Sequence, residues 1–410
     1  MVSQLDLSSN QLCGLDRYGH GTYTAEGITA IADALRVNGG LTSLNLSNNA
    51  LCGVVVYFGG RVSGTYTAEG ITAIADALRV NGSLTSIDVR QNNIAGDGAV
   101  QLAAAVLGNL KIEIFNKIPI KEMRANSLTE LDLNWKYFGV EGGMVVAGLI
   151  PVMGGLTKLS LERNNLEEEG TKAICEALKQ NKTLKELDIS GGDYGSIGGS
   201  AGAKHVARML GVNGGLTSLN LSSNLIGGYW DHEQETNVFT PEGTKAIADA
   251  LLINGALTSL NLSSNQLCGL DILQRGTYTA EGITAIADAL RLNGGLTSLD
   301  LSSNQLCGLD HADRGTYTAE GLTAIADALR VNGGLTALNL SSNRLLDEGV
   351  SAVCKAIQSN KETKLASLNM GNNRFGPVGA KSMAAMVAVT GALTEVWETC
   401  QPTTSYRLFS

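Results

Sequence analysis

The most regular feature of the chain is an alternation of leucine and polar residues that returns along nearly its whole length. In one copy, Leu41, Leu44 and Leu46 are separated by polar residues, and Asn49 follows three positions after the last leucine. The same spacing, L-x-x-L-x-L-x-x-N, begins again at Leu156, Leu216, Leu257, Leu296 and Leu335, and with substitutions at Leu84, Leu128, Leu184 and Leu365. Internal repetition of this kind predicts a stack of similar layers rather than one globular core.

Within one copy, the spacing predicts a short strand with two different faces. Leu44 and Leu46 are two residues apart, so both point into the core, and the serine and asparagine residues beside them point outward. Asn49 ends the strand, and its amide can pair with backbone groups that the turn would leave without partners inside the stack. We therefore expect a ladder of buried asparagines with one member in each regular copy.

The residues that follow each turn predict a helix. In the segment 25–36, Ile28, Ile31, Ala32 and Leu35 recur with the spacing of one helical face. Thr24 is the expected N-cap of this helix. Each copy therefore predicts one strand and one helix.

Glycine marks both ends of these predicted helices. The sequence Asn38-Gly39-Gly40 is expected to end the helix and turn the chain into the next strand. Another glycine recurs near each helix start, at Gly27, Gly70, Gly98, Gly142, Gly170, Gly202, Gly243, Gly282, Gly321, Gly349 and Gly379. We interpret it as a position where neighbouring layers approach closely or where φ is positive.

The copies that begin at Leu128, Leu156 and Leu184 are 28 residues apart. This frame is the signature of leucine-rich repeats, and residues 169–184 resemble the ribonuclease-inhibitor-like class and the sensor arrays of NOD-like receptors. The resemblance implies an α/β solenoid, a leucine-rich-repeat horseshoe with parallel strands on the concave face and helices on the convex face.

The resemblance covers nearly the whole chain. We expect a repeat array at 1–392, with about eleven full or partial repeats, and a C-terminal partial repeat and tail at 393–410. The array is irregular at 107–127, where the isoleucines and Pro119 of the segment 111–126 predict a short strand and a loop without room for another helix. Residues 118–124 resemble a spacer found in repeat arrays of unicellular eukaryotes.

Several copies are longer than the plain repeat. Those that begin at Leu257, Leu296 and Leu335 are 39 residues apart, and the excess falls between the asparagine of the strand and the helix. Long insertions of this kind follow Asn10, Asn49, Asn224, Asn265 and Asn304. All of them should emerge on one rim, in two patches, and their alternating flanks predict hairpins.

The tips of these insertions differ although the copies are otherwise almost identical. The candidate contact residues are Tyr18, His20, Tyr57, Phe58, Tyr229, Trp230, His232, Ile272, Leu273 and His311. Two interpretations stay open, namely drift at solvent-exposed turns and a surface that contacts a partner. Exposed aromatic residues favour the second, because they are typical interface anchors.

The outward positions of the strands carry mostly serine and asparagine, which offer a partner few anchors. The middle of the array differs, because Glu130, Asp132 and Lys158 are charged. Next to them, Trp135 and Tyr137 flank a lysine that replaces the ladder asparagine. Two interpretations are open here as well, an interaction hot spot or a cover over the edge where the frame breaks.

Composition and charge narrow the classes of partner. The chain has 410 residues, a hydrophobic fraction of 44%, only 5% aromatic residues and a formal net charge of −9. The absence of a basic run argues against nucleic acid and anionic membrane as partners, because binding to phosphates depends on a basic face. No apolar stretch in the sequence is long enough to span a bilayer, and residues 1–7 do not resemble a secretory signal.

Seven cysteines are present, and four of them recur at one repeat position: Cys13, Cys52, Cys268 and Cys307. Reduced, mostly buried thiols would place the chain in the cytoplasm or another reducing intracellular compartment. The alternative is a disulfide between neighbouring layers, joining Cys13 to Cys52 or Cys268 to Cys307.

Catalytic chemistry finds little support in the sequence. The glycine-rich run 191–202 lacks the Gly-Lys-Ser/Thr ending of a phosphate-binding loop, and the Asp231-His232-Glu233 sequence is more typical of a solvated loop than of a metal site. We expect no catalytic residue, no cofactor and no metal, and the chain is not predicted to be an enzyme.

The leading hypothesis is an interaction scaffold that binds another protein through the rim insertions, with the central concave face as a second candidate surface. One alternative is a GTPase-activating protein, since a Ran GTPase-activating protein uses this repeat class. Another is an architectural subunit of a larger assembly. The chain begins inside a repeat with no cap over Leu5 and Leu7, so a preceding segment, a partner or a second copy is expected to cover that end.

Overall fold

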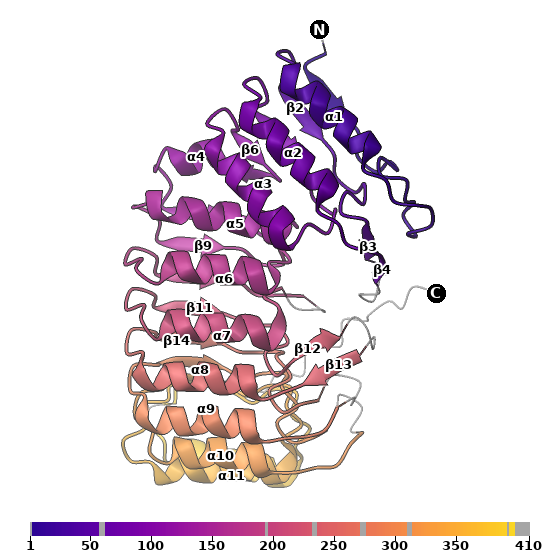
Figure 1. Cartoon of the computed structure of the whole chain (residues 1–410). Coiled ribbons are helices and arrows are strands. Elements are labelled where there is room, and N and C mark those ends of the chain that lie inside the picture. The colour runs from indigo at the N-terminus through magenta and orange to yellow at the C-terminus, as the bar shows by residue number, and fades with distance from the viewer. Residues whose placement is uncertain are drawn as a thin grey trace. The chain divides into compact units, whose positions relative to one another are not determined.

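The computed structural model describes residues 2–56, 62–192, 196–231, 236–270, 276–309, 314–391 and 393–397. The chain divides into two compact units. The first unit comprises Met1–Leu216 with Trp230–Thr236, and the second comprises Thr217–Tyr229 with Asn237–Ser410. Each unit alternates short strands with helices, as the repeated frame predicts (Figure 1).

The first unit contains two runs of paired strands. One run follows the order β1 (Gln4–Asp6), β2 (Ser43–Asn45), β5 (Ser86–Asp88), β6 (Ile114–Phe115) and β7 (Ile118–Pro119). Its neighbours are parallel except for β6 and β7, which form an antiparallel hairpin. The other run contains the parallel strands β8 (Glu130–Asp132), β9 (Lys158–Ser160) and β10 (Glu186–Asp188).

The helices of the first unit stack side by side (Figure 1). They are α1 (Glu26–Val37), α2 (Glu69–Val80), α3 (Gly96–Gly108), α4 (Ile120–Arg124), α5 (Gly139–Leu149), α6 (Glu167–Leu178) and α7 (Gly199–Leu210), with a short 3-10 helix, η1 (Ile150–Val152), after α5. Because α4 has a single turn, α3 packs directly against α5. The prediction that the irregular segment has no room for a helix is therefore wrong, since one turn fits after the β6–β7 hairpin.

The second unit continues the same alternation. Its parallel strands are β11 (Ser218–Asn220), β14 (Ser259–Asn261), β15 (Ser298–Asp300), β16 (Ala337–Asn339), β17 (Ser367–Asn369) and β18 (Glu395–Trp397). Its helices are α8 (Glu242–Ile253), α9 (Glu281–Leu292), α10 (Glu320–Leu329), α11 (Leu346–Ser359) and α12 (Pro377–Val387). Strand β18 confirms the partial last copy predicted after residue 392.

The frame leucines fill the space between strands and helices. Leu44 is 1% exposed and Leu46 is not exposed, while the strand residues beside them face outward. On the helix side, Ile28, Ala32 and Leu35 are buried as the helical spacing predicts. The register is exact from layer to layer, with Leu44 opposite Leu5 and Ile87. Each buried side chain therefore packs against its counterparts in the layers above and below.

The predicted asparagine ladder is present. The Nδ2 atom of Asn49 donates to the carbonyl oxygens of Leu46 and Leu7, each at 2.9 Å, and its Oδ1 accepts from the backbone N–H of Asn10 at 3.0 Å. The backbone N–H of Asn49 donates in turn to Oδ1 of Asn92 at 2.8 Å. One buried amide thus satisfies backbone groups in two layers, which explains why asparagine recurs at this position.

A second ladder, which the sequence reasoning missed, joins the helix ends. Asn81, at the C-cap of α2, donates from Nδ2 to the carbonyl of Leu35 at 2.7 Å, and its Oδ1 accepts from the N–H of Leu84 at 2.8 Å. The equivalent asparagines are Asn109, Asn213, Asn293, Asn332 and Asn360. This side chain therefore bonds the backbone groups at the helix end. The C-cap Asn38 has an extended backbone, so the helix does not need a left-handed glycine to end there. The sequence signal for this second ladder was another recurrent asparagine, a few residues before each strand.

At the helix starts, the structure corrects one prediction and decides between the two explanations given for the recurrent glycine. Helix α1 begins at Glu26 with Ala25 as N-cap, so Thr24 lies one residue too early, although its hydroxyl accepts from the N–H of Glu26 at 3.3 Å. The recurrent glycine is explained by close approach and not by positive φ. A Cβ at Gly70 would lie 2.8 Å from Ile28 Cγ2 and 2.9 Å from the carbonyl oxygen of Leu51.

The rim insertions begin as predicted, with antiparallel pairing. Hairpin strands β3 (Val54–Val56) and β4 (Val62–Gly64) form one insertion, and β12 (Gly228–Asp231) and β13 (Thr236–Phe239) belong to another. Three others have a single antiparallel bridge, at Leu15–Gly21, Leu270–Gly276 and Leu309–Gly315. The residues that close each insertion are therefore ordered in a hairpin-like way.

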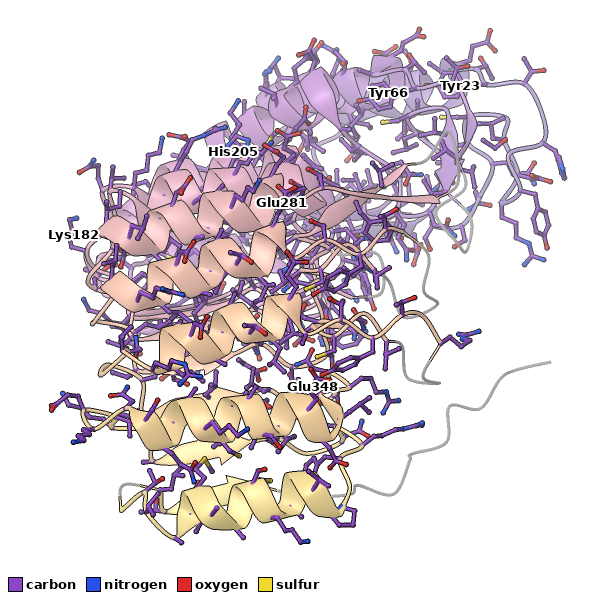
Figure 2. The ribbon with its side chains drawn as sticks, turned by 90° about the horizontal axis from the view of Figure 1, so that it is seen from below. Tyr23, Tyr66, Lys182, His205, Glu281 and Glu348 are labelled. Atoms are coloured by element: carbon purple, nitrogen blue, oxygen red, sulfur yellow. The ribbon has the colours of Figure 1, made fainter. Side chains whose placement is uncertain are left out.

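A tyrosine ties each of four insertions to the next layer. The hydroxyls of Tyr23, Tyr278 and Tyr317 donate to the carbonyls of Leu51, Leu306 and Leu345 at 3.0 to 3.2 Å, and Tyr66 donates to the carbonyl of Ala95. Tyr23 and Tyr66 occupy equivalent places in neighbouring layers (Figure 2). The insertions are thus anchored to the solenoid at their bases.

The thiols within the described residues are free and buried, and no disulfide joins Cys13 to Cys52 or Cys268 to Cys307. Burial raises the pKa of Cys13 to about 11 and the pKa of Cys307 to about 12. These thiols are therefore protonated and unreactive in the folded chain at neutral pH. The disulfide alternative is wrong for these four positions.

Candidate functional site

A hollow lies on the rim of the first unit. Its volume is about 1180 Å³. We call it the rim hollow. It is lined by Ser9, Asn10, Gln11, Leu15, Asp16, Arg17, Tyr18, Asn48, Asn49, Ala50, Val54, Val55, Val56, Val62, Gln91, Asn92, Asn93, Ile94, Ala95, Tyr137, Gly139, Val140, Glu141, Asn165 and Glu167. Most of these residues lie in the segments after β1, β2, β5, β8 and β9, and the others belong to β3, β4 and the first turns of α5 and α6.

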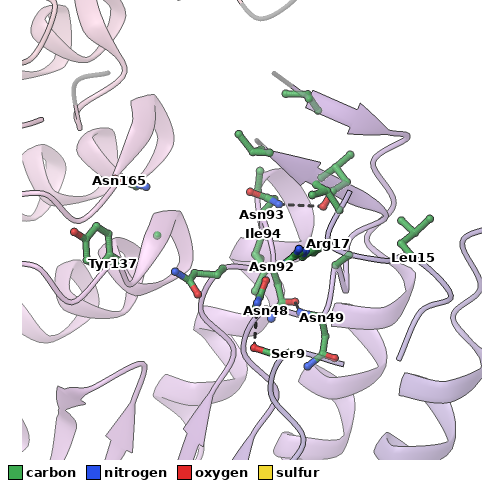
Figure 3. Close-up of a pocket in the computed structure, with 18 of the residues that line it drawn as sticks. Ser9, Leu15, Arg17, Asn48, Asn49, Asn92, Asn93, Ile94, Tyr137 and Asn165 are labelled. Atoms are coloured by element: carbon green, nitrogen blue, oxygen red, sulfur yellow. Dashed lines mark hydrogen bonds between the residues drawn. The ribbon is translucent and has the colours of Figure 1, made fainter. Parts of the chain in front are cut away.

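The irregular layer creates space for the rim hollow. Between the turns at 91–95 and 137–141, this layer contributes a two-residue hairpin turn and a five-residue helix instead of a full rim turn. Tyr137 and Asn165 therefore lie on one side of the hollow, and Leu15 and Arg17 lie on the other (Figure 3). The walls are rich in asparagine and glutamine, whose amides offer both hydrogen-bond donors and acceptors.

Two of the predicted contact residues line this hollow from opposite turns. Tyr18 is 47% exposed and Tyr137 is 41% exposed. Trp135, which is 48% exposed, packs edge-on against Tyr137, with ring centroids 6.4 Å apart and an interplanar angle of 81°. The structure thus brings together aromatic residues that are more than a hundred positions apart in the sequence.

Backbone geometry explains why Trp135 and Tyr137 are displayed. Both have left-handed conformations, with φ of 59° and 54°, on either side of Lys136. The residues that flank the ladder asparagine share this conformation in other layers, for example Gln91 and Asn93 with φ of 58° and 52°. A left-handed backbone costs an aromatic residue roughly 1–2 kcal/mol. Placing two aromatic rings here therefore stores strain in the exposed turn.

A cation covers part of this aromatic pair. The guanidinium carbon of Arg163 lies 4.1 Å from the centroid of the Trp135 ring. The Nε atom of Arg163 is buried without a hydrogen-bond partner and lies 3.7 Å from a carboxylate oxygen of Glu162. Such a cation–π contact contributes about 0.5–1 kcal/mol at an exposed site. It holds the indole ring in place at the edge of the hollow.

The frame break beneath the aromatic pair is closed by other side chains. Lys136 keeps the backbone contact of the ladder, because its N–H donates to Oδ1 of Asn164 at 3.0 Å. Arg90 is bound to Asp88 and donates to the carbonyl of Lys136 at 2.8 Å. The aromatic residues are therefore not needed to cover the break, and this observation favours their interpretation as an exposed contact surface.

A buried carboxyl group lies in the wall of the hollow. Glu141 is 3% exposed and accepts from Nδ2 of Asn116 at 2.9 Å. Burial raises the pKa of Glu141 to about 8, and the charge of Asp88 adds to the increase. At neutral pH this side chain is therefore mainly an uncharged acid. Nothing in the sequence indicates this role, since Glu141 resembles an ordinary acidic residue in the first turn of α5.

The tip at 16–20 is a compact turn organised by Asp16. Its Oδ1 accepts from the N–H groups of Tyr18 at 2.8 Å and His20 at 2.9 Å, and its Oδ2 lies 3.2 Å from Nδ1 of His20. These bonds, the backbone bond from His20 first among them, lower the pKa of Asp16. His20 lies 6.0 Å from the Tyr18 ring and is 79% exposed, so it stands at the outer end of the tip.

The other predicted contact residues cannot be placed in the same way. Tyr57, Phe58, His232, Ile272, Leu273 and His311 lie outside the described residues. Tyr229 and Trp230 belong to β12, and the positions of their side chains are also outside the description. The strands β3 and β4, which lead to and from Tyr57 and Phe58, contribute Val54, Val55, Val56 and Val62 to the hollow.

The strand face of the second unit is different. A shallow depression of about 270 Å³ lies over β15, β16 and β17, lined by Ser298, Leu299, Asp300, Ala337, Leu338, Asn339, Ser367 and Asn369. Its polar residues are small, as the sequence predicts. It offers a partner no aromatic anchor among these residues.

Two further findings concern the described part of the chain. No three histidine, cysteine, aspartate or glutamate side chains gather there in a way that could hold a metal ion. None of its helices has the length and hydrophobicity needed to cross a membrane.

Comparison with known proteins adds a family match. A model described as a leucine-rich repeat matches residues 80–103, 335–354 and 361–384, and each of these segments contains a strand (β5, β16 or β17) and the start of the helix that follows it. The chain has the fold of a leucine-rich-repeat solenoid. The matches, the alternating strands and helices and the parallel pairing together establish the α/β solenoid fold.

Similar solved structures are distant. The leucine-rich-repeat-containing protein LegL7 from Legionella pneumophila is 17% identical, with a TM-score of 0.40, over 96% of this chain and 89% of that one. A structure of leiomodin-1 actin-binding site 2 is 21% identical, with a TM-score of 0.30, over 53% of this chain and 88% of that one. No curated protein matches this leucine-rich-repeat chain.

Proposed function

We propose that the chain is a protein-interaction module whose contact surface is the rim hollow of the first unit together with Trp135. The observation that carries the proposal is the set of exposed aromatic residues, Tyr18, Trp135 and Tyr137, at one hollow. Tyrosine and tryptophan dominate binding energy at protein interfaces because they bury large areas and lose little side-chain entropy. Proteins with leucine-rich repeats commonly bind other proteins, and this site gives such binding a location.

The strained turn strengthens the proposal. The equivalent positions in other layers carry asparagine, serine, glutamine, arginine, alanine or leucine, for example Asn93, Leu225 and Ser264. In the described part of the chain, Trp135 and Tyr137 are the aromatic residues with this left-handed backbone, which a bulky ring tolerates less well than asparagine does. A cost of this kind is expected at functional surfaces.

The setting is proposed to be a reducing one, in the cytoplasm or a similar compartment, because six buried thiols are free. The repeat lengths support assignment to the ribonuclease-inhibitor-like class. The GTPase-activating and architectural alternatives receive no support from the geometry of the hollow.

The test replaces the aromatic pair by Trp135→Asn and Tyr137→Asn in the full chain. Asparagine fits the backbone, so we expect the free energy of unfolding to stay within about 1 kcal/mol of the original value. Affinity purification from the native source, quantified by mass spectrometry, should show at least about a tenfold loss of the captured partners.

A matched control makes the same kind of change in the second unit. Ser264→Asn and Gln266→Asn alter the two left-handed positions that flank Asn265. These changes should leave capture intact. If the partners are captured equally by both variants, the rim hollow is not the contact surface.

A further inference from the structure

The carboxylates beside the rim hollow bear on the chemistry of its partner, and the inference rests on the function proposed above. Strands β8 to β10 and the turns after β8 and β9 carry the acids Glu130, Asp132, Glu162, Glu186 and Asp188 and the cations Lys136, Lys158 and Arg163, and Arg17 lines the hollow itself. Glu130, Asp132 and Glu186 are exposed. In the second unit, strands β11, β14, β15, β16 and β17 carry Asp300 as their one acid, and Glu395 lies on the last strand, β18.

Three of these four cations contact other groups within the chain. Lys158 Nζ lies 3.2 Å from Glu186 Oε2, and the pKa of Lys158 is raised by this hydrogen bond, then by the charges of Glu186, Glu130 and Asp188. Arg163 lies over the Trp135 ring, and Arg17 lies over the Tyr18 ring. Acids outnumber cations on these strands and turns, and Asp132, the last residue of β8, is the carboxylate nearest in sequence to Trp135.

The hollow itself offers a different kind of contact. The amides of Gln91 and Asn165 in its walls can both donate to and accept from a peptide backbone, whereas Nδ2 of Asn93 already donates to the carbonyl of Val54 and leaves its Oδ1 as an acceptor. Tyr18 and Tyr137 at its two sides can hold apolar parts of side chains, including the alkyl stems of lysine and arginine. A folded helix would satisfy its own backbone groups and leave these amides without partners, so an extended segment fits the hollow better.

We propose that the rim hollow binds an extended peptide segment with basic side chains, which reach from the aromatic pair onto the carboxylates of β8 to β10. The backbone of the segment pairs with the amides of the hollow. Its lysine or arginine side chains lie against Trp135 and Tyr137 and approach Glu130, Asp132 and Glu186. Charge complementarity selects this partner over an acidic one, since like charges at an interface are repelled.

The experiment measures the fluorescence anisotropy of three labelled peptides with the full chain. They alternate serine with lysine, with glutamine or with glutamate, and have equal length. We expect the lysine peptide to bind most tightly, the glutamine peptide weakly and the glutamate peptide not at all. Binding of the lysine peptide should weaken as salt is raised from 50 to 300 mM, because exposed charges are screened.

Two variants locate the binding. The affinity for the lysine peptide should fall about tenfold in a variant that combines Glu130→Gln, Asp132→Asn and Glu186→Gln. The control removes three other acids that are paired with a cation on their own helix, by Asp33→Asn, Asp76→Asn and Glu176→Gln, and should change affinity less than twofold. The Trp135→Asn and Tyr137→Asn variant should also weaken the peptide.

The outcomes separate this inference from the proposed function. If the asparagine pair abolishes capture of the native partner but the lysine peptide binds no better than the glutamate peptide, the contact surface stands and the basic partner is wrong. If the variant without the strand acids and the control variant without the helix acids weaken binding of the lysine peptide equally, the peptide is attracted by the overall negative charge and the inference fails. If the asparagine pair affects neither capture nor peptide binding, the proposed function fails as well.

Discussion

Asparagine is the residue that links neighbouring layers of this solenoid, because one buried amide makes the hydrogen bonds that several backbone groups would otherwise make to water. Asn92 shows the full pattern. Its Nδ2 donates to the carbonyls of Val89 and Leu46 at 2.7 and 3.0 Å, and its Oδ1 accepts from the N–H of Asn49 at 2.8 Å. No other side chain of similar size provides two donors and an acceptor at one point.

Replacing Asn92 by alanine should therefore be costly. The change leaves buried backbone groups of two layers without partners, and we expect the free energy of unfolding to fall by about 3 kcal/mol. Urea unfolding followed by circular dichroism measures the change. Ser86→Ala, on the outward side of β5, serves as control and should cost well under 1 kcal/mol. Equal effects of the two changes would contradict the role given to the ladder.

Glu141 predicts a specific dependence of stability on pH. Its pKa is about 8 in the folded chain against 4.5 in its ordinary state, so the folded chain binds more protons between these values. The stability contributed by this group is present below pH 4.5, is lost as pH rises towards 8, and changes little above that. The loss is about 1.4 kcal/mol per pH unit where it is steepest.

The Glu141→Gln variant tests this prediction. Glutamine keeps the shape of the uncharged acid, so the variant should unfold at a higher urea concentration than the original chain at pH 8 and at a similar one at pH 4.5. Midpoints measured at several pH values give the difference between the two curves. Parallel curves would show that Glu141 is ionised in the folded chain.

At the scale of elements, close contact between layers decides where glycine is required. A Cβ at Gly321 would lie 2.7 Å from Ile283 Cγ2 and 3.0 Å from the hydroxyl of Tyr278, which also accepts from the N–H of Gly321. Gly294, at the turn after α9, has nothing within 4 Å of its Cβ position. Packing between layers therefore requires glycine at position 321 and does not require it at position 294.

The two glycines predict opposite effects of alanine. Gly321→Ala should lower the free energy of unfolding by about 1–3 kcal/mol, because neighbouring side chains must move. Gly294→Ala should raise it by up to about 1 kcal/mol, because the unfolded chain loses freedom and the folded chain loses no contact. Thermal unfolding of both variants decides the matter, and a stabilising Gly321→Ala would mean that the layers are less tightly packed than described.

At the scale of the whole molecule, the regular layers bury their thiols. Burial raises the pKa of Cys52 and of Cys354 to about 12, which suppresses the reactive thiolate. In a Cys400→Ser variant, which removes a cysteine outside the described residues, a thiol reagent such as 5,5′-dithiobis(2-nitrobenzoate) should label the native chain only very slowly at pH 7.4. After unfolding in guanidinium, six thiols should react. Fewer than six would reveal a disulfide.

The sequence by itself determined the repeating layer. Leucine spacing specified which strand residues are buried, the ladder asparagines were identifiable from their place after the strand, and apolar spacing located the helices. These features are local, since each depends on residues a few positions apart. For the same reason the pattern failed at α4, where a single turn is too short to have a helical period.

The tertiary structure alone decided the candidate site. Tyr18 and Tyr137 line one hollow because a shortened layer removes a rim turn between them. The sequence shows that this layer is irregular, but it does not show which turns come together around it. Glu141 becomes an uncharged acid because layers from distant parts of the chain exclude water from it. The rim insertions could be recognised in the sequence, but their surfaces depend on which turns the stacked layers bring together.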